Sequence, residues 1–267
     1  MDTLTYHHYY LAPHLDDAVL SCGGLIHRQL QKGESVLVVT VFAGTPRYTD
    51  LSAFASFLHG TWDLGPDPVA VRRAEDIRAL ATLGADHLHL DRQDCIYRRA
   101  PTGGDWFYSS RDDILGGIHP GEAHLEEDLA EELRAILPSS AGSTLCAPLG
   151  VGQHVDHQIV HGCALLLLLE GHDVRFFEDY PYALREGKLD KALREPPGGD
   201  WSPYLEALSP EDLAAKIRAI NEYGSQLGLL FGGRAEAEEA TRAFAASLGA
   251  EGGYAERYWQ LRQTRND

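Results

Sequence analysis

The stretch from Ser35 to Ala43, SVLVVTVFA, constrains the fold more than any other part of the sequence. It is an almost unbroken apolar run rich in β-branched residues, which is typical of a strand covered on both faces in a parallel sheet. A β-rich segment over residues 4–12 and a helical pattern over residues 18–33, closed by Gly33, precede it. The first 43 residues therefore predict a strand–helix–strand unit with a right-handed crossover.

The alternation of strands and helices continues along the chain. We expect helices over residues 69–85, 122–138 and 158–171, and strands over residues 86–91, 143–148 and 173–183. Beyond residue 185 a polar, broken stretch leads into helical patterns over residues 209–226, 234–250 and 254–263. The prediction is an α/β fold, a Rossmann-like three-layer α/β/α arrangement with a mainly parallel sheet. Its domains are a catalytic core over residues 1–185 and a mainly helical C-terminal extension over 186–267, packed on that core.

Charge and cysteine content exclude several functional classes. A formal net charge of −17 repels phosphate backbones and anionic lipid, so we expect neither nucleic acid nor a membrane as partner. The apolar run Leu165–Leu169 is too short to cross a bilayer. The four cysteines are far apart and form no CxxC pair, and the N-terminus carries no basic leader, which favours a reduced, cytoplasmic location. The sequence leaves a homo-oligomer open.

Two polar clusters follow predicted strands. His14, Asp16 and Asp17 come after the first strand, and the segment His154–His157 precedes the buried helix at 158–171. Because ligands of parallel sheets bind beyond the carboxyl ends of the strands, we expect both clusters in one crevice. A catalytic zinc takes three ligands from His, Asp and Glu and leaves one position to water. A further carboxylate and a further imidazole would then serve as proton acceptor and oxyanion donor.

Structural roles compete with this interpretation. Asp16 or Asp17 is also a good helix N-cap, and an H-x-x-H spacing alone is a weak signal for metal. Asp156 is either a partner of a ligand histidine or a helix cap. Two long irregular segments, residues 44–68 and 92–121, are of a length that favours a lid or pocket wall.

The segment APHLDDAVLSCGG (residues 12–24) resembles the first signature of the LmbE-like, or PIG-L, family of zinc-dependent N-acetylglucosaminyl deacetylases. QHVDHQIV (153–160) resembles the family's second signature. VRRAEDIRALATLGA (71–85), DCIYRR (94–99) and FEDYPYA (177–183) add support, so that the resemblance covers about the first 185 residues.

This resemblance implies a role for each matching position. The ligands of Zn²⁺, or of another divalent ion such as Fe²⁺, would be His14, Asp17 and His157. Asp16 would be the general base, and His154 a charged imidazole that steadies the oxyanion. Arg72 and Asp94 would contact the sugar.

Four positions depart from the family's pattern. Leu15 and Val155 stand where proline is frequent, Ala18 where glutamate is frequent, and Gly152 where some members carry tyrosine. None of them is an implied ligand.

The expected function is metal-dependent removal of an N-acetyl group from an N-acetylglucosamine-type glycoside or a related small molecule. Two alternatives remain open at this point. One is a metal-dependent glycosyltransferase, in which paired acids hold an ion on a nucleotide-sugar diphosphate. The other is a non-catalytic sugar-binding member of the same fold.

Overall fold

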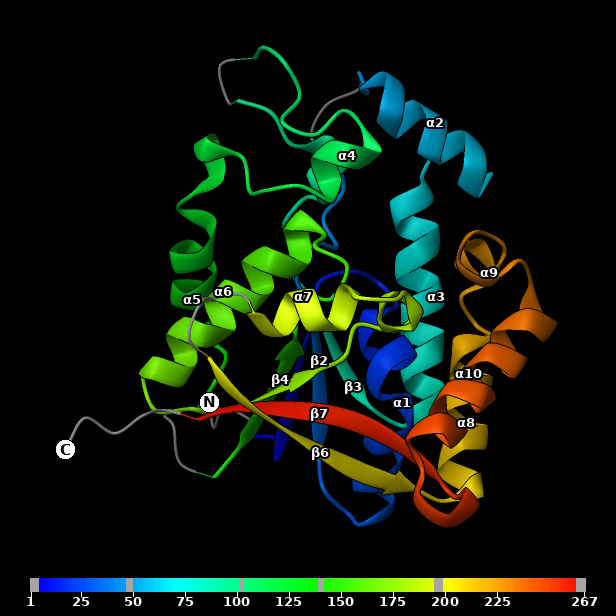
Figure 1. Ribbon diagram of the computed structural model, residues 1–267. Coiled ribbons are helices and arrows are strands. Elements are labelled where there is room, and N and C mark those ends of the chain that lie inside the picture. The colour runs from blue at the N-terminus through cyan, green and yellow to red at the C-terminus, as the bar shows by residue number, and fades with distance from the viewer. Residues whose placement is uncertain (1–4, 47–49, 101–102, 139–141, 195–198, 263–267) are drawn as a thin grey trace.

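A computed structural model describes residues 5–46, 50–100, 103–138, 142–194 and 199–262. Its centre is a seven-stranded sheet of order β3-β2-β1-β4-β5-β7-β6 (Figure 1). The strands are β1 (His8–Ala12), β2 (Val36–Thr40), β3 (Asp86–His89), β4 (Thr144–Pro148), β5 (Asp173–Phe177), β6 (Asp200–Leu208) and β7 (Tyr254–Arg262). The first five strands are mutually parallel, while β7 pairs antiparallel with β5 and β6 antiparallel with β7.

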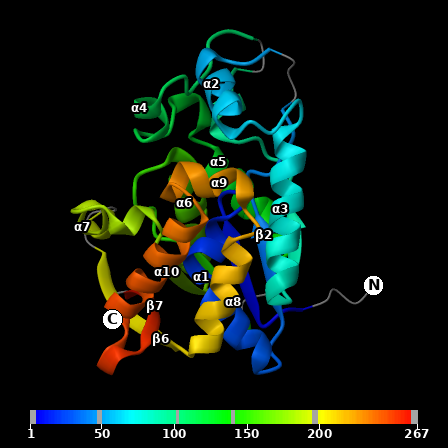
Figure 2. The ribbon, with the colours of Figure 1, turned by 90° about the vertical axis from the view of Figure 1, so that its right-hand side faces the viewer.

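Helices cover both faces of this sheet. The α-helices of the described chain are α1 (Asp17–Gln31), α2 (Ala53–Trp62), α3 (Pro68–Leu83), α4 (Arg111–Ile114), α5 (Leu125–Arg134), α6 (Val155–Leu169), α7 (Lys188–Arg194), α8 (Pro210–Ile220), α9 (Gly224–Phe231) and α10 (Arg234–Leu248). Helices α5 and α6 lie on one face, and α1, α3 and α8 lie on the other (Figures 1 and 2). Helices α2 and α4 stand beyond one end of the sheet. The predicted α/β class with a mainly parallel sheet is confirmed.

Adjacent residues of the central strands pack into two separate hydrophobic cores, one on each face of the sheet. In β1, Tyr9 and Leu11 pack toward α5 and α6, whereas Tyr10 and Ala12 pack toward α1, α3 and α8. Successive side chains of a strand point to opposite faces, and here both faces are buried. Apolar residues are therefore needed at every position, which explains the unbroken β-branched pattern of the sequence. The sheet is therefore covered on both faces, and its strand ends are left to carry polar groups.

The structure corrects the prediction for the C-terminal segment. Residues 254–262, expected to be helical, form strand β7, and Gln263 of that prediction lies outside the described residues. Its bulky side chains, Tyr254, Tyr258 and Trp259 among them, suit a pleated surface between β5 and β6. The C-terminal segment thus adds strands as well as helices, and the division of the chain at residue 185 stays a prediction.

Further elements were missed in segments that the sequence marks as irregular, among them strand β6 and the helices α2, α4 and α7. Strand β6 is an edge strand whose burial is only partial, and an edge tolerates its Pro203. Helix α2 begins at the Ser52 cap, whose side chain accepts the Ala55 N–H, inside the segment predicted to be a loop. Residues 47–49 and 101–102 of the two predicted lid segments lie outside the described residues. Among the helices that the structure describes, none combines the length and the apolar composition that crossing a bilayer requires.

Candidate metal centre

The two polar clusters meet at the carboxyl ends of β1 and β4. These strands are parallel neighbours, with Tyr10 opposite Cys146, so the segments that follow them emerge side by side. The ring centroids of His14 and His154 lie 4.8 Å apart, and those of His14 and His157 lie 5.3 Å apart. All three rings are buried, as are Asp16 and Asp17.

A tight loop sets where the second cluster begins. Gly150 and Gly152 have φ values of 81° and 98°, and Gln153 has a φ of 65°, so the chain turns through left-handed backbone just before α6. A Cβ on Gly152 would lie 3.0–3.1 Å from the ring and Cβ of Tyr182. This tyrosine therefore occupies the space beside Gly152, and its ring centroid lies 6.0 Å from that of His157.

Asp17 lies between two histidines. Its Oδ2 atom is 3.3 Å from Nδ1 of His14 and 3.3 Å from Nε2 of His157. The Nε2 atom of His157 is buried and has no hydrogen-bond partner within the described part of the chain. Burial lowers the pKa of His157, but Asp17 and Asp179 outweigh burial and raise that pKa to about 10. A buried, unsatisfied imidazole nitrogen in negative surroundings fits a divalent cation.

The outer partners of the two histidines fix their tautomers. Nε2 of His14 lies 2.9 Å from Oδ2 of Asp156, and Nδ1 of His157 lies 2.5 Å from Oδ1 of Asp179. Carboxylates accept, so these two nitrogens carry protons, and the opposite nitrogens, which face Asp17, can present lone pairs to a metal ion once they are deprotonated. Asp156 therefore contacts a proposed ligand histidine, and the helix cap, its other expected role, belongs to His154.

His154 differs from the other two histidines. Its Nδ1 accepts the backbone N–H of Asp156 at 3.3 Å and so caps α6, which leaves the proton of the neutral ring on Nε2. Burial, followed by the charge of His14, holds the pKa of His154 well below its ordinary value. The family resemblance implies a charged imidazole here, whereas the buried, capped ring favours a neutral Nε2–H donor. Although the three histidines each bring one nitrogen within 4.8 Å of the others, His154 is arranged to donate rather than to ligate.

Asp16 forms an ion pair with Arg72. Its Oδ2 lies 3.7 Å from Nη2 of Arg72. Burial and the charge of Asp17 raise the pKa of Asp16 to about 6, although Arg72 opposes the shift. A buried carboxylate with a pKa close to neutrality is suited to accept a proton and to release it again.

The two expected sugar contacts line a small cavity next to the centre. The guanidinium carbon of Arg72 lies 5.2 Å from the centroid of the Trp62 ring, and Oδ2 of Asp94 lies 3.7 Å from Nε2 of His14. Both residues border the cavity together with Leu15, Phe42, Gly44, Trp62, Val69 and Tyr97. Gly44 is required there by close approach, since a Cβ would lie 2.8 Å from the Asp91 carbonyl carbon.

Sequence reasoning missed Asp179, Tyr182 and Arg98. The first two lie in the FEDYPYA segment, after β5, and the position after a parallel strand was the available signal. In the sequence, Arg98 stands only within the DCIYRR segment that supports the family resemblance. Its ion pair with Asp156, at 2.6 Å, joins residues 58 positions apart, which no local pattern reveals.

A mainly parallel α/β sheet with two imidazoles, one bridging carboxylate and a second carboxylate at its strand ends defines a metal-dependent hydrolase. The family model described as PIG-L: GlcNAc-PI de-N-acetylase matches residues 9–167, and the chain belongs to this family. The resemblance drawn from the two histidine motifs is thereby confirmed.

Named relatives agree with this assignment. A 2'-N-acetylparomamine deacetylase of Niallia circulans is 27% identical over 251 residues, which cover 85% of this chain and 83% of the relative. The crystal structure of a zinc-inhibited form of teicoplanin deacetylase Orf2 is 32% identical, with a TM-score of 0.86, and 97% of this chain and 99% of that chain are covered. The A40926 pseudoaglycone deacetylase Dbv21 is 30% identical, with a TM-score of 0.76 and coverage of 99% and 100%.

Proposed function

We propose that the protein is a zinc-dependent N-deacetylase that hydrolyses the N-acetyl amide of an N-acetylglucosamine-type glycoside. The observation that carries the proposal is the Asp17 carboxylate between Nδ1 of His14 and Nε2 of His157, with Asp16 beside it. Relatives named for deacetylation of 2'-N-acetylparomamine, teicoplanin and the A40926 pseudoaglycone support a glycoside as substrate.

Each polar residue of the centre has a role in this reaction. His14, Asp17 and His157 hold the ion, which when bound polarises a carbonyl and acidifies water. Asp16 accepts the proton of the attacking water and later supplies a proton to the leaving nitrogen. His154 donates its Nε2–H to the carbonyl oxygen as negative charge develops there. Acetate and a free amine are the products.

The donor set argues against transfer from a nucleotide sugar. Mg²⁺ and Mn²⁺ on a diphosphate prefer oxygen ligands, whereas two imidazoles and one carboxylate suit zinc. The same set, with Asp16 in place, argues against a non-catalytic sugar-binding protein.

We assign Arg72 and Asp94 to the sugar, because the family resemblance implies this role and because the two residues lie beside Asp16 and His14. A cytoplasmic location belongs to the proposal as well, because all four cysteines are free and buried.

The test is release of amine and acetate by purified, zinc-loaded protein from a panel of N-acetylated amino-sugar glycosides. We expect both products in equal amounts, and no transfer of sugar from a nucleotide donor. Metal content is measured on the same sample. A fully zinc-loaded protein that releases amine from no member of the panel would contradict the proposal.

A further inference from the structure

A chain of buried charges leads from the metal centre to the segment after β3. Nη1 of Arg98 lies 2.6 Å from Oδ1 of Asp156, whose other oxygen, Oδ2, lies 2.9 Å from Nε2 of His14. On its far side the same guanidinium contacts Glu122, with Nε 2.7 Å from Oε1 and Nη2 donating to Oε2 at 3.1 Å. The side chains are 10% exposed for Arg98, 5% for Glu122 and 0% for Asp156.

Aromatic rings hold the guanidinium in one orientation. The guanidinium carbon of Arg98 lies 4.9 Å from the centroid of the Phe42 ring and 5.4 Å from that of Tyr108. The Tyr108 hydroxyl donates to Oε2 of Glu122 at 2.8 Å, which fixes the carboxylate that Arg98 contacts. The planar guanidinium of Arg98, held by two carboxylates and two aromatic rings, has little conformational freedom, and the ammonium group of a lysine cannot make the same set of contacts.

We propose that Arg98 is a positioning residue of the metal centre, which fixes Asp156 and thereby aims Nδ1 of His14 at the metal. Arg98 holds Oδ1 of Asp156, so that Oδ2 faces His14 and the backbone N–H of Cys95, which donates to it at 3.1 Å. Without this cation, Asp156 and Glu122 would be two buried carboxylates with no guanidinium between them. The inference rests on the proposed function only in taking His14 as a metal ligand.

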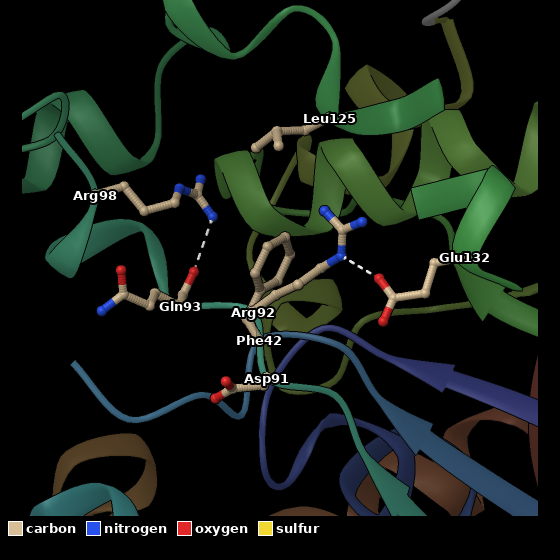
Figure 3. A pocket seen from close by; sticks show the side chains of 7 residues that line it. All are labelled: Phe42, Asp91, Arg92, Gln93, Arg98, Leu125 and Glu132. Atoms are coloured by element: carbon tan, nitrogen blue, oxygen red, sulfur yellow. Dashed lines mark hydrogen bonds and ion pairs between the residues drawn. The ribbon is translucent and has the colours of Figure 1, made fainter. Parts of the chain in front are cut away.

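The surroundings of Arg98 offer a direct test of its charge. Its side chain lines a cavity of about 450 Å³, in which Arg92 pairs with Glu132 at 2.7 Å on the opposite wall (Figure 3). Small solutes can reach the guanidinium through this cavity. When Arg98 is shortened to alanine, free guanidinium can therefore enter the space that the side chain leaves.

The experiment measures the zinc affinity of the apoprotein by competition with a chromophoric chelator. We expect Arg98→Ala to bind zinc about 10- to 100-fold more weakly than the wild type, as is usual when an outer partner of a ligand is lost. Guanidinium at a concentration too low to unfold the protein restores part of the affinity, and urea, which is similar in shape but uncharged, does not. Arg98→Lys is expected to keep the fold but recover little affinity.

The matched control is Lys216→Met, which removes another buried cation. Nζ of Lys216 lies 2.7 Å from Oε1 of Glu256, and both side chains are about as buried as those of Arg98 and Glu122. This variant should lose stability and keep the zinc affinity of the wild type.

Two results would overturn the proposal. One is wild-type zinc affinity in both Arg98→Ala and Arg98→Lys. The other is equal rescue by urea and guanidinium. If Arg98→Ala does not fold, Arg98→Lys and Glu122→Gln carry the same measurement. The two proposals can also fail separately. If the wild type binds zinc but releases no amine, and Arg98→Ala binds zinc more weakly than the wild type, the proposed function is contradicted and this inference is supported.

Discussion

Nδ1 of His157 lies 2.5 Å from Oδ1 of Asp179, a residue that follows β5 rather than either histidine motif. The other oxygen of Asp179 accepts the backbone N–H of Val151 at 2.8 Å, so one buried carboxylate joins the loop before α6 to the ring of His157. The orientation of this ring is therefore set by a third strand of the sheet, which extends the metal centre beyond β1 and β4.

We predict that Asp179→Ala lowers zinc affinity about 10- to 100-fold, because His157 loses the acceptor that fixes its tautomer. Asp179→Asn should lose less, since its amide oxygen can still accept from Nδ1. Competition with a chelator measures both variants. Affinities that are equal to that of the wild type in both would show that Asp179 only supports the Val151 loop.

Asp16→Asn is predicted to keep zinc and to lose turnover by about 10²- to 10⁴-fold, the range for a removed general base. The carboxylate of Asp16 forms its ion pair with Arg72, whereas Asp17 contacts both proposed ligand histidines, so we expect the loss of Asp16 to spare the metal. Asp17→Asn is the comparison, because it should lose metal as well. Zinc content and amine release are measured on each, and wild-type turnover in Asp16→Asn would remove Asp16 from the mechanism.

His154→Asn tests whether this residue donates or ligates. Asparagine caps a helix well and carries an amide N–H, so we expect zinc to stay bound while turnover falls about 10²- to 10³-fold. Loss of zinc from this variant would instead make His154 a ligand. The measurement is metal content after dialysis, followed by amine release at saturating substrate.

Gly152→Ala should lower both stability and turnover. The backbone there has a φ of 98°, and an added Cβ would lie 3.0 Å from Cγ of Tyr182. Strain of this kind costs about 1–3 kcal/mol in the free energy of unfolding. Thermal unfolding checks it, and Gly187→Ala, at a φ of 71° with no atom near its Cβ, separates backbone strain from the clash with Tyr182.

The sequence was sufficient for those features that local patterns determine. The β-branched run over residues 35–43 predicted a buried parallel strand, and the rule for strand ends then brought His14 and His157 together. Strands β6 and β7 escaped prediction because both mix polar with aromatic residues, and because β6 is a partly exposed edge strand. Their pairing is a tertiary effect that no window of residues contains.

The outer contacts of the site were beyond sequence reasoning for a related reason. Asp156 meets His14 across 142 positions of the chain, and its ion pair with Arg98 depends on how the segment after β3 lies against α6. The neutral state of His154 follows from burial and from its own capping bond. The second histidine motif identifies His154 as a candidate, but only the fold shows which of its nitrogens carries the proton.

Removal of the metal should destabilise the protein and make zinc affinity dependent on pH. A ligand that binds only the folded state at 100 times its dissociation constant adds about 2.7 kcal/mol of stability, so chelation should lower the unfolding temperature. Although burial lowers the pKa of His157, Asp17 and Asp179 raise it to about 10 in the metal-free centre. Zinc must therefore displace a proton, and its affinity should rise as the pH rises toward that value. His157→Ala should show neither the stabilisation by zinc nor the pH dependence. A wild-type zinc affinity that stays constant between about pH 6 and pH 9 would contradict the assignment of His157 as a ligand.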